Sequence, residues 1–318
     1  MIHALSYVVA YTPHLEPWTR MAAEQVGLQV EPLPDGQGAR LRMDDKYQRL
    51  LLLKAGQADM IMGFEVADAG ALEVTAGLLA AAGFPVEAGR HEDAESRGVA
   101  DFLWFRDPDG RRIEVAWGLR EAATPFQPGR PLGGFRTGEL GIGHVALITE
   151  HFEEMCRLYK AVLGFRVSDR ARAPFRVEFL HVNPRHHTLG IAHTGGPAKI
   201  YHLMLEYRDF DDLGRAYDMA LESPESIGVT LGRHINDHVT SFYLKNPDGW
   251  MLELGWAART VGPDWQVEEL EGMSLWGHDR TWLPPDKREE ARQILKSLAR
   301  KGVRVPVVTD SQNRTAHP

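Results

Sequence analysis

The sequence predicts an α+β protein built from four repeated units, each a strand, a helix and several further strands, with two units in each half of the chain. Three observations predict this class: a hairpin motif that occurs once in each half, a strand-and-helix pattern that recurs, and a stretch rich in Pro and Gly between the halves. The chain has 318 residues, of which 43% are hydrophobic, so it can supply the cores of two domains.

The hairpin motif is the clearest repeat. The segments "FLWFRDPDGRRIEVAWG" (102–118) and "FYLKNPDGWMLELGW" (242–256) share a strand, an Asx-Pro-Asp-Gly turn and a second strand, with a Glu four residues after the Gly. Pro and Gly fit a tight turn that pairs two strands. We therefore expect equivalent hairpins in the two halves.

A strand followed by a helix precedes each hairpin. Residues 2–30 parallel residues 140–167 in this respect, and a finer repeat of the same kind appears at 58–86 and 199–223. These matches give the count of four units.

The expected division of the chain follows from these repeats. We expect an N-terminal pair of units, a linker, a C-terminal pair of units, and an extension with one helix, at 1–120, 121–140, 141–265 and 266–318. The extension's helix is opened by Pro and Asp and closed by Gly302. We interpret it as a packing or subunit-contact element, without assigning it any chemistry.

Composition excludes several classes of function. A net charge of −8 argues against a nucleic-acid binder, which needs clustered Lys and Arg. No apolar stretch approaches the length of a membrane span, and the first residues lack the pattern of a signal peptide, so we expect a cytoplasmic protein that acts on small molecules. The single cysteine, Cys156, excludes an internal disulfide framework.

Three residues of the second half are candidate metal ligands. His144, His202 and Glu253 each lie in the middle of a predicted strand, in matching places of the repeated unit. Taken alone, Glu253 could face water, because alternation separates it from Leu252 and Leu254. Two histidines and a carboxylate on one face, however, form the set that binds Fe(II) and leaves positions open for substrate and oxygen.

Comparison of the halves supports this interpretation. The first half has Tyr7 opposite His144 and Ile61 opposite His202, and it keeps only Glu114 opposite Glu253. If the fold itself required the histidines, both halves would be expected to have them. The second half is therefore predicted to hold the metal.

The second half also resembles the type I extradiol dioxygenases of the vicinal oxygen chelate superfamily. Their signature reads here as Gly232-x-His234, seven residues, Phe242-Tyr243, two residues, Asn246-Pro247-x-Gly249, three residues and Glu253. Over about residues 1–265 the chain resembles their two-domain form, the 2,3-dihydroxybiphenyl 1,2-dioxygenase group. The resemblance implies that each pair of βαβββ modules forms an incomplete β-barrel with flanking helices.

The resemblance also implies an activity. It is the extradiol ring cleavage of a catechol by O2, with Fe(II) as cofactor, or Mn(II) in its place, bound by His144, His202 and Glu253. The implied product is a 2-hydroxymuconic semialdehyde type of acid. The two-domain length favours a bulky biphenyl-like or fused-ring diol as the substrate. Relatives assemble as homo-oligomers, so the same is expected here.

Five further residues match functional positions of the family. His187 matches a histidine that stabilises negative charge near oxygen and then donates a proton. His234 and Tyr243 match a pair that hydrogen-bonds the substrate oxygens, and Asn236 and Asp237 match residues beside them that line the pocket.

Other histidines are weaker candidates. Strand alternation turns His186 away from the pocket that His187 faces, whereas His181 and His193 share the parity of His187, and only the family match selects among those three. The others, among them His151, His238 and His278, are interpreted as surface or structural residues.

Two rival functions use the same repeated unit. One is a metal-dependent lyase or isomerase of the glyoxalase type, whose sites usually draw ligands from paired units and lack the signature from His234 to Glu253. The other is a non-catalytic binding protein, which typically lacks the metal triad. Metal content separates the second rival from an enzyme.

Overall fold

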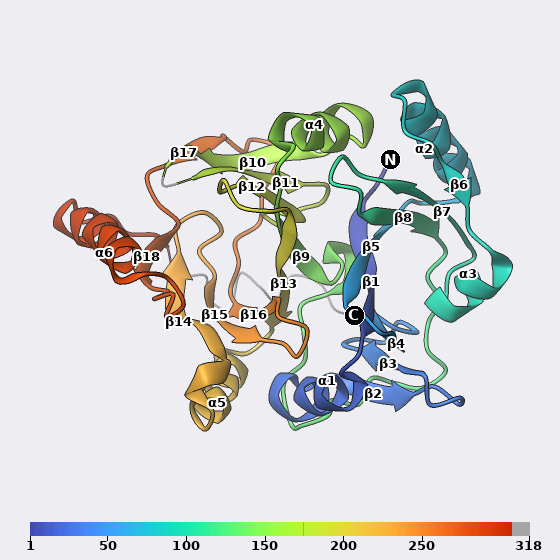
Figure 1. Cartoon of the computed structure of the whole chain (residues 1–318), viewed down its shortest axis with the longest axis horizontal. Coiled ribbons are helices and arrows are strands. Elements are labelled where there is room, and N and C mark those ends of the chain that lie inside the picture. Colours follow the sequence, from blue (N-terminus) through green and yellow to red (C-terminus); the bar gives the residue numbers. More distant parts are fainter. Residues whose placement is uncertain (174, 307–318) are drawn as a thin grey trace.

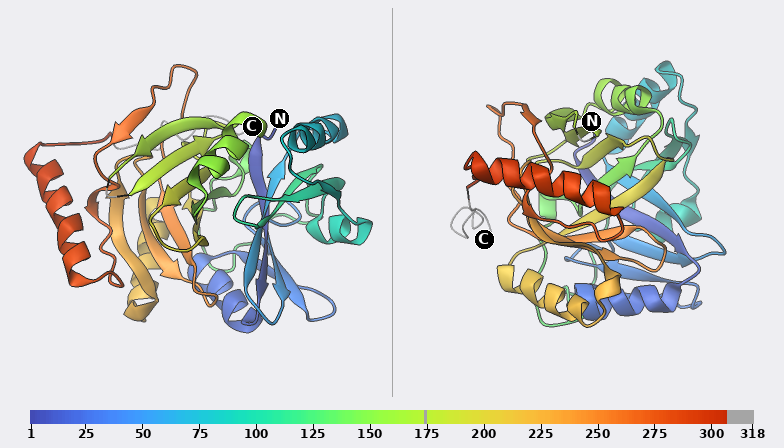
Figure 2. Two further views of the ribbon diagram at one scale, coloured as in Figure 1. Left: turned by 45° about the horizontal axis from the view of Figure 1, so that its top comes forward. Right: turned by 60° about the vertical axis from the view of Figure 1, so that its left-hand side comes forward.

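The computed structural model describes residues 1–173 and 175–306. It contains two mixed β-sheets that curl into half-barrels and lie side by side, with the helices around their outside (Figures 1 and 2). The predicted α+β class of repeated units is confirmed. Among the described helices, none is both long and apolar enough to cross a membrane.

The first half forms an eight-stranded sheet. Its strands are β1 (Ala4–Thr12), β2 (Gln29–Pro32), β3 (Gly38–Arg42), β4 (Leu50–Lys54), β5 (Asp59–Glu65), β6 (Glu87–Ala88), β7 (Asp101–Arg106) and β8 (Arg112–Trp117). They are ordered β2-β3-β4-β1-β5-β8-β7-β6. The helices of this half are α1 (Leu15–Met21), which continues into the π-helical turn η1 (Ala22–Val26), α2 (Ala69–Ala81) and α3 (His91–Arg97).

The second half forms a ten-stranded sheet. Its strands are β9 (Gly143–Ile148), β10 (Arg166–Ala171), β11 (Arg176–His181), β12 (Leu189–His193), β13 (Lys199–Tyr207), β14 (Ile227–His234), β15 (Thr240–Lys245), β16 (Met251–Trp256), β17 (Glu268–Leu270) and β18 (Ser274–Gly277). The order is β17-β10-β11-β12-β9-β13-β16-β15-β14-β18. The helices are η2 (Gly138–Leu140), α4 (Phe152–Arg157) with its π-helical turn η3 (Leu158–Val162), α5 (Phe210–Leu221), η4 (Pro224–Ser226) and α6 (Pro285–Arg300).

The tail after residue 265 takes part in the second sheet. β17 pairs with β10 at one edge, and β18 pairs with β14 at the other. Helix α6 then packs on the outer side of β18, at the end of the molecule farthest from the first half (Figure 1). The sheet that holds the candidate ligands is therefore completed by the extension.

Both predicted hairpins are present. The Gly110 amide donates to the Asp107 carbonyl at 2.8 Å, and the Gly249 amide donates to the Asn246 carbonyl at 3.1 Å. The two glycines have φ values of +82° and +87°, a conformation that a residue with a Cβ adopts only at a cost. This explains why the Pro-Asp-Gly motif occurs at both turns.

The hairpin turns also join the halves. The Asp248 carboxylate accepts hydrogen bonds from Thr12 Oγ1 at 2.7 Å and Trp18 Nε1 at 2.6 Å. At the equivalent turn of the first half, Asp109 accepts a hydrogen bond from Nδ1 of His151, a residue of the second half, at 2.9 Å. Since the main hydrophobic core is also continuous from β1 and β5 to β9 and β13, the two half-barrels form one packed body.

A buried ion pair anchors the linker to the second sheet. Glu206 on β13 is fully buried, and its two carboxylate oxygens lie 2.6 Å from Arg185 Nη1 and 3.0 Å from Arg136 Nη1. Burial acts to raise the pKa of Glu206, but the two guanidinium groups outweigh it and hold the pKa below its usual range. Glu206 is therefore ionised in the folded protein.

Replacing Glu206 with Gln is expected to lower the free energy of unfolding by about 3–5 kcal/mol, because Arg185 would stay buried without its counter-ion. A pKa lowered by folding means that the stabilisation is present above the unfolded pKa of about 4.3 and is lost as the pH falls through the folded value. Urea unfolding followed by tryptophan fluorescence measures both effects. Glu290→Gln, which removes an exposed pair with Lys287, is the control and should change stability by less than about 1 kcal/mol. Equal stability of Glu206→Gln and the parent would contradict the assignment.

Candidate active site

A row of side chains crosses the concave face of the second sheet. Met204 on β13 pairs with both His144 on β9 and Glu253 on β16, and Glu253 pairs with Tyr243 on β15. Directly paired residues point to the same face of a sheet, as do residues two apart along a strand. His202, two residues before Met204, therefore joins the others on this face.

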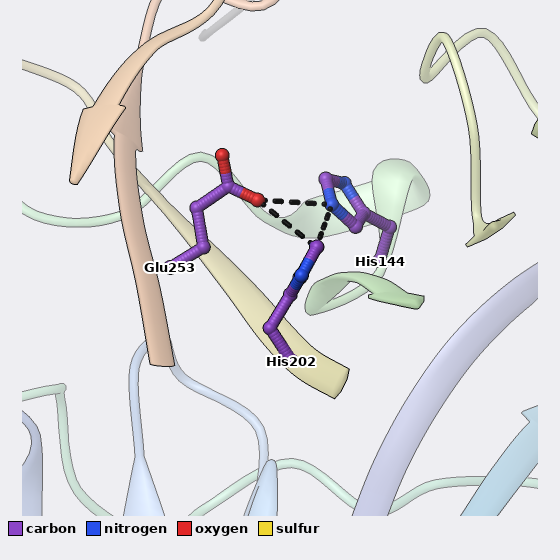
Figure 3. Close-up of side chains that lie close together, drawn as sticks. All are labelled: His144, His202 and Glu253. Carbon is purple, nitrogen blue, oxygen red and sulfur yellow. Dashed lines mark hydrogen bonds and ion pairs between the residues drawn. The ribbon is translucent and has the colours of Figure 1, made fainter. Parts of the chain in front are cut away.

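The candidate ligands converge at the centre of the row (Figure 3). Nε2 of His144 and Nε2 of His202 lie 3.0 Å apart, and they lie 3.2 Å and 3.1 Å from Glu253 Oε2. All three residues are buried, with exposed fractions of 7% or less. Their separations are uniform, so the three atoms form a nearly equilateral triangle.

This triangle fits a divalent metal ion. Metal–ligand bonds of about 2.1 Å at right angles place neighbouring ligand atoms about 3.0 Å apart. The three atoms thus match one face of an octahedron, and the opposite face would be open to substrate and oxygen. Two imidazole nitrogens and one buried carboxylate oxygen are also electron-pair donors, and a bound cation would stabilise them at these short separations.

The second carboxylate oxygen of Glu253 is held away from the triangle. Ser241 Oγ donates to Oε1 at 2.6 Å, and His234 Nε2 lies 3.3 Å from the same atom. Burial acts to raise the pKa of Glu253, but its histidine neighbours, led by His202, keep it well below the usual range. Oε2 of an ionised Glu253 is therefore free for a single metal bond.

His234 and Tyr243 lie beside the triangle as a hydrogen-bonded pair. Tyr243 Oη is 2.8 Å from His234 Nε2, and His234 Nδ1 is 2.8 Å from the Met273 carbonyl. A carbonyl only accepts, so Nδ1 carries a proton. Burial works against the charged imidazole, yet Glu253 outweighs this effect and raises the pKa of His234.

His187 and the triangle line the same cavity. The His187 ring lies against that of His144, with centroids 3.8 Å apart and the planes tilted by 31°, and its Nδ1 lies 3.8 Å from the Asp237 carboxylate. Burial, reinforced by His144, lowers the pKa of His187 well below its usual value, so the imidazole is neutral.

A chain of polar groups, Asp169 and His186, lies behind His187. His186 Nε2 lies 2.8 Å from Asp169 Oδ2, and His186 Nδ1 lies 3.1 Å from His187 Nδ1. The carboxylate can accept the Nε2 proton of His186, and where His186 Nδ1 accepts, His187 donates from its own Nδ1 and keeps a lone pair at Nε2. In that arrangement the Nε2 lone pair of His187 can take a proton.

The structure brings all eight sequence-predicted site residues to one cavity, and adds others. The additional lining residues are Ala146, Phe175, Val177, Phe179, Gly190, Ala192, Tyr201, Met273 and Arg280. Of the weaker histidines, His186 contacts His187 from outside the cavity, and His278 is a buried support of Ser241, with Nε2 at 3.3 Å from Oγ.

In the first half, arginine side chains occupy the equivalent place. Tyr7 Oη donates to Glu114 at 2.7 Å, and Arg97 Nη2 lies 3.0 Å from the same carboxylate. The register of Tyr7 with Gly63 and of Gly63 with Glu114 repeats that of His144, Met204 and Glu253. Arg112 Nη2 lies 2.8 Å from the Glu114 carboxylate as well, so two guanidinium groups supply the positive charge that the carboxylate requires there.

Comparison with known proteins gives the same picture. Residues 141–254 match the model of the Glyoxalase/Bleomycin resistance protein/Dioxygenase superfamily. The chain is 37% identical to a biphenyl-2,3-diol 1,2-dioxygenase of Metapseudomonas furukawaii over 87% of this chain and 93% of that protein. It is 34% identical to an iron-dependent extradiol dioxygenase of Rhodococcus jostii, over 87% and 97%.

A solved structure is similar over nearly the same length. The crystal structure of a halotolerant catechol dioxygenase superposes with a TM-score of 0.85 at 33% identity, and the match covers 90% of this chain and 96% of that one. Sequence, fold and the arrangement of His144, His202 and Glu253 agree: the chain belongs to the extradiol ring-cleavage dioxygenases of this superfamily.

Proposed function

We propose that this protein cleaves the ring of a bulky catechol beside its two hydroxyl groups and inserts both atoms of O2, giving a 2-hydroxymuconic semialdehyde type of acid. The observation that carries the proposal is the triangle of His144, His202 and Glu253, which has one open side toward the cavity. The apolar wall formed by Phe175, Val177 and Phe179 suits a biphenyl-like or fused-ring substituent.

His144, His202 and Glu253 are the proposed ligands of Fe(II), and Mn(II) accepts the same donors. With two neutral imidazoles and one carboxylate, the loaded site has a net charge of about +1, which favours an ionised catechol. When bound, the metal would supply electron transfer between catechol and O2. The remaining steps depend on the side chains around it.

His234 and Tyr243 would hydrogen-bond a catechol oxygen and fix the orientation of the ring, with Asn236 and Asp237 beside them. His187 Nε2 would take a proton from the substrate and return it during ring cleavage, while stabilising negative charge in between. Its neutral resting state and its Nδ1 contact with His186 support this role.

The two halves would then differ in task. We propose that residues 141–265 are catalytic, that 121–140 are a linker and that 1–120 are a scaffold without a metal. In the scaffold, Arg97 forms an ion pair with the carboxylate of Glu114, which corresponds to the metal ligand Glu253. A homo-oligomeric assembly and a cytoplasmic location remain predictions.

The rival functions have weaker support. The glyoxalase-type hypothesis does not account for the hydrogen-bonded His234–Tyr243 pair. The hypothesis of a non-catalytic binding protein does not account for three converging metal donors. Metal content and oxygen consumption separate all three functions.

The test is anaerobic reconstitution with Fe(II), followed by mixing with oxygenated 2,3-dihydroxybiphenyl and, in parallel, catechol. We expect a yellow product, one O2 consumed per diol, and faster turnover of the biphenyl. Bound iron without colour or oxygen uptake for a panel of catechols would contradict the proposal. A metal-free protein that binds the diol would favour the non-catalytic alternative.

A further inference from the structure

The C-terminal extension places a cationic side chain in the substrate cavity. Arg280 follows β18, and it pairs with Val229 on β14, which in turn pairs with Tyr243 on β15. By this register, Arg280 lies on the same face of the sheet as Tyr243 and Glu253. Its half-buried side chain lines the cavity together with those of Tyr201 and Tyr243.

The charge of Arg280 has no carboxylate partner among the described residues. The neighbouring Asp279 pairs with Arg288 on α6, with Nε to Oδ1 at 3.0 Å, and not with Arg280. Arg280 Nη1 donates to the His278 carbonyl at 3.4 Å, and the side chain is also within hydrogen-bonding reach of Tyr201. A guanidinium has five N–H donors, so donors remain for another group.

Arg280 stays charged in this setting. Burial acts to lower its pKa, but the interaction with Tyr201, which includes a side-chain hydrogen bond, outweighs that effect and the pKa lies above its usual value. A cation withdrawn from water without a counter-ion is costly, and such a group is stabilised when an anion binds.

The rest of the cavity sets the kind of anion. Arg280 is the one Lys or Arg among the lining residues that the structure describes, and Phe175, Val177 and Phe179 form an apolar wall. The cavity therefore offers a metal site for the catechol oxygens, an apolar surface for the substituent and one cationic side chain, that of Arg280. A guanidinium binds a planar carboxylate with two parallel hydrogen bonds.

We propose that Arg280 is a specificity-determining residue that binds an acidic substituent of the catechol, of the carboxylate class. The inference rests on the proposed function and narrows its substrate class: a catechol that carries an anionic group in addition to apolar bulk.

The test compares acidic and neutral catechols of matched size. The first pair is 3-(2,3-dihydroxyphenyl)propanoate and 3-propylcatechol, and the second is 3,4-dihydroxyphenylacetate and 4-ethylcatechol. The Fe(II)-loaded enzyme should prefer the acid in one pair, and that pair identifies the ring position that faces Arg280. Arg280→Gln should lower kcat/KM for this acid about 10- to 100-fold more than for its neutral partner.

The loss should fall mainly in KM, because the ion pair is present in the ground state and the transition state alike. Arg280→Lys keeps the positive charge but cannot make two parallel hydrogen bonds, so this variant should recover part of the lost kcat/KM. Equal losses for acid and neutral partner would overturn the inference, since Arg280 would then support the fold or the catechol oxygens. Failure of the wild-type enzyme to cleave any catechol would instead overturn the proposed function.

Discussion

Replacing His202 with Ala is expected to remove the metal and, with it, measurable ring cleavage. His202 supplies one of three donor atoms, and its Nε2 lies within 3.1 Å of both other donors. The remaining pair, His144 and Glu253, would hold a divalent ion by two bonds only. Losing several kcal/mol of metal-dependent stabilisation corresponds to a fall in kcat/KM of about 1,000-fold or more.

The measurement is metal content per chain after anaerobic reconstitution with Fe(II) and desalting, together with oxygen uptake. His181→Ala is the matched control, because His181 is equally buried on β11 of the same sheet but lies outside the triangle. The control should retain iron and turnover. A His202→Ala protein that binds a full equivalent of iron and cleaves catechols would refute the ligand assignment, and a thermal melt shows whether either variant has lost its fold.

The fold and the centre of the site could be predicted because their signals are local or repeated. Each Asx-Pro-Asp-Gly turn fixes a hairpin through four adjacent residues, of which Gly110 and Gly249 adopt positive φ. Comparison of the two hairpins with their upstream strands aligned Tyr7 with His144, and the structure pairs the equivalent strands in the same register. Sequence repeats and strand alternation therefore sufficed to bring His144, His202 and Glu253 together.

The surroundings of the site could not be predicted, because they depend on contacts between distant segments. Ser241 is an ordinary strand residue until the pairing of β15 with β16 sets it beside Glu253. Asp169, on β10, contacts His186 although 17 positions of the chain separate them. Arg280 lies in the extension, whose pairing at the β14 edge has no periodic signal in the sequence.

Strand parity also fails where the ladder is irregular. Tyr201 precedes His202 and should point away from the cavity, yet both line it. The pairing of β13 with β9 shifts between Ile200 and His202, so Tyr201 sits at an irregularity that lets neighbouring residues face one side. The preference for His187 over His181 and His193 likewise came from the family match and not from alternation.

Replacing His187 with Phe is expected to leave the metal bound and to slow turnover by about 100- to 10,000-fold, the range for losing a positioned acid–base group. His187 does not belong to the triangle, so the donor atoms of His144, His202 and Glu253 stay in place. Phe fills a similar volume and preserves the ring contact with His144, which has a centroid separation of 3.8 Å. The change therefore removes the nitrogen that moves the proton while keeping the packing.

Single-turnover experiments separate the steps. Anaerobic binding of the catechol to the iron-loaded variant should be retained, and the reaction after addition of O2 should be slow. Asp169→Asn tests the contacts behind His187: it weakens the acceptor that faces His186 Nε2, so it should slow the same oxygen-dependent step to a smaller extent and alter its pH profile. His193→Phe, at the end of β12, is the control and should behave like the parent. If His187→Phe turned over at the parental rate, the proton transfer would have to be assigned to another group, and His234 is the remaining imidazole of the cavity outside the triangle.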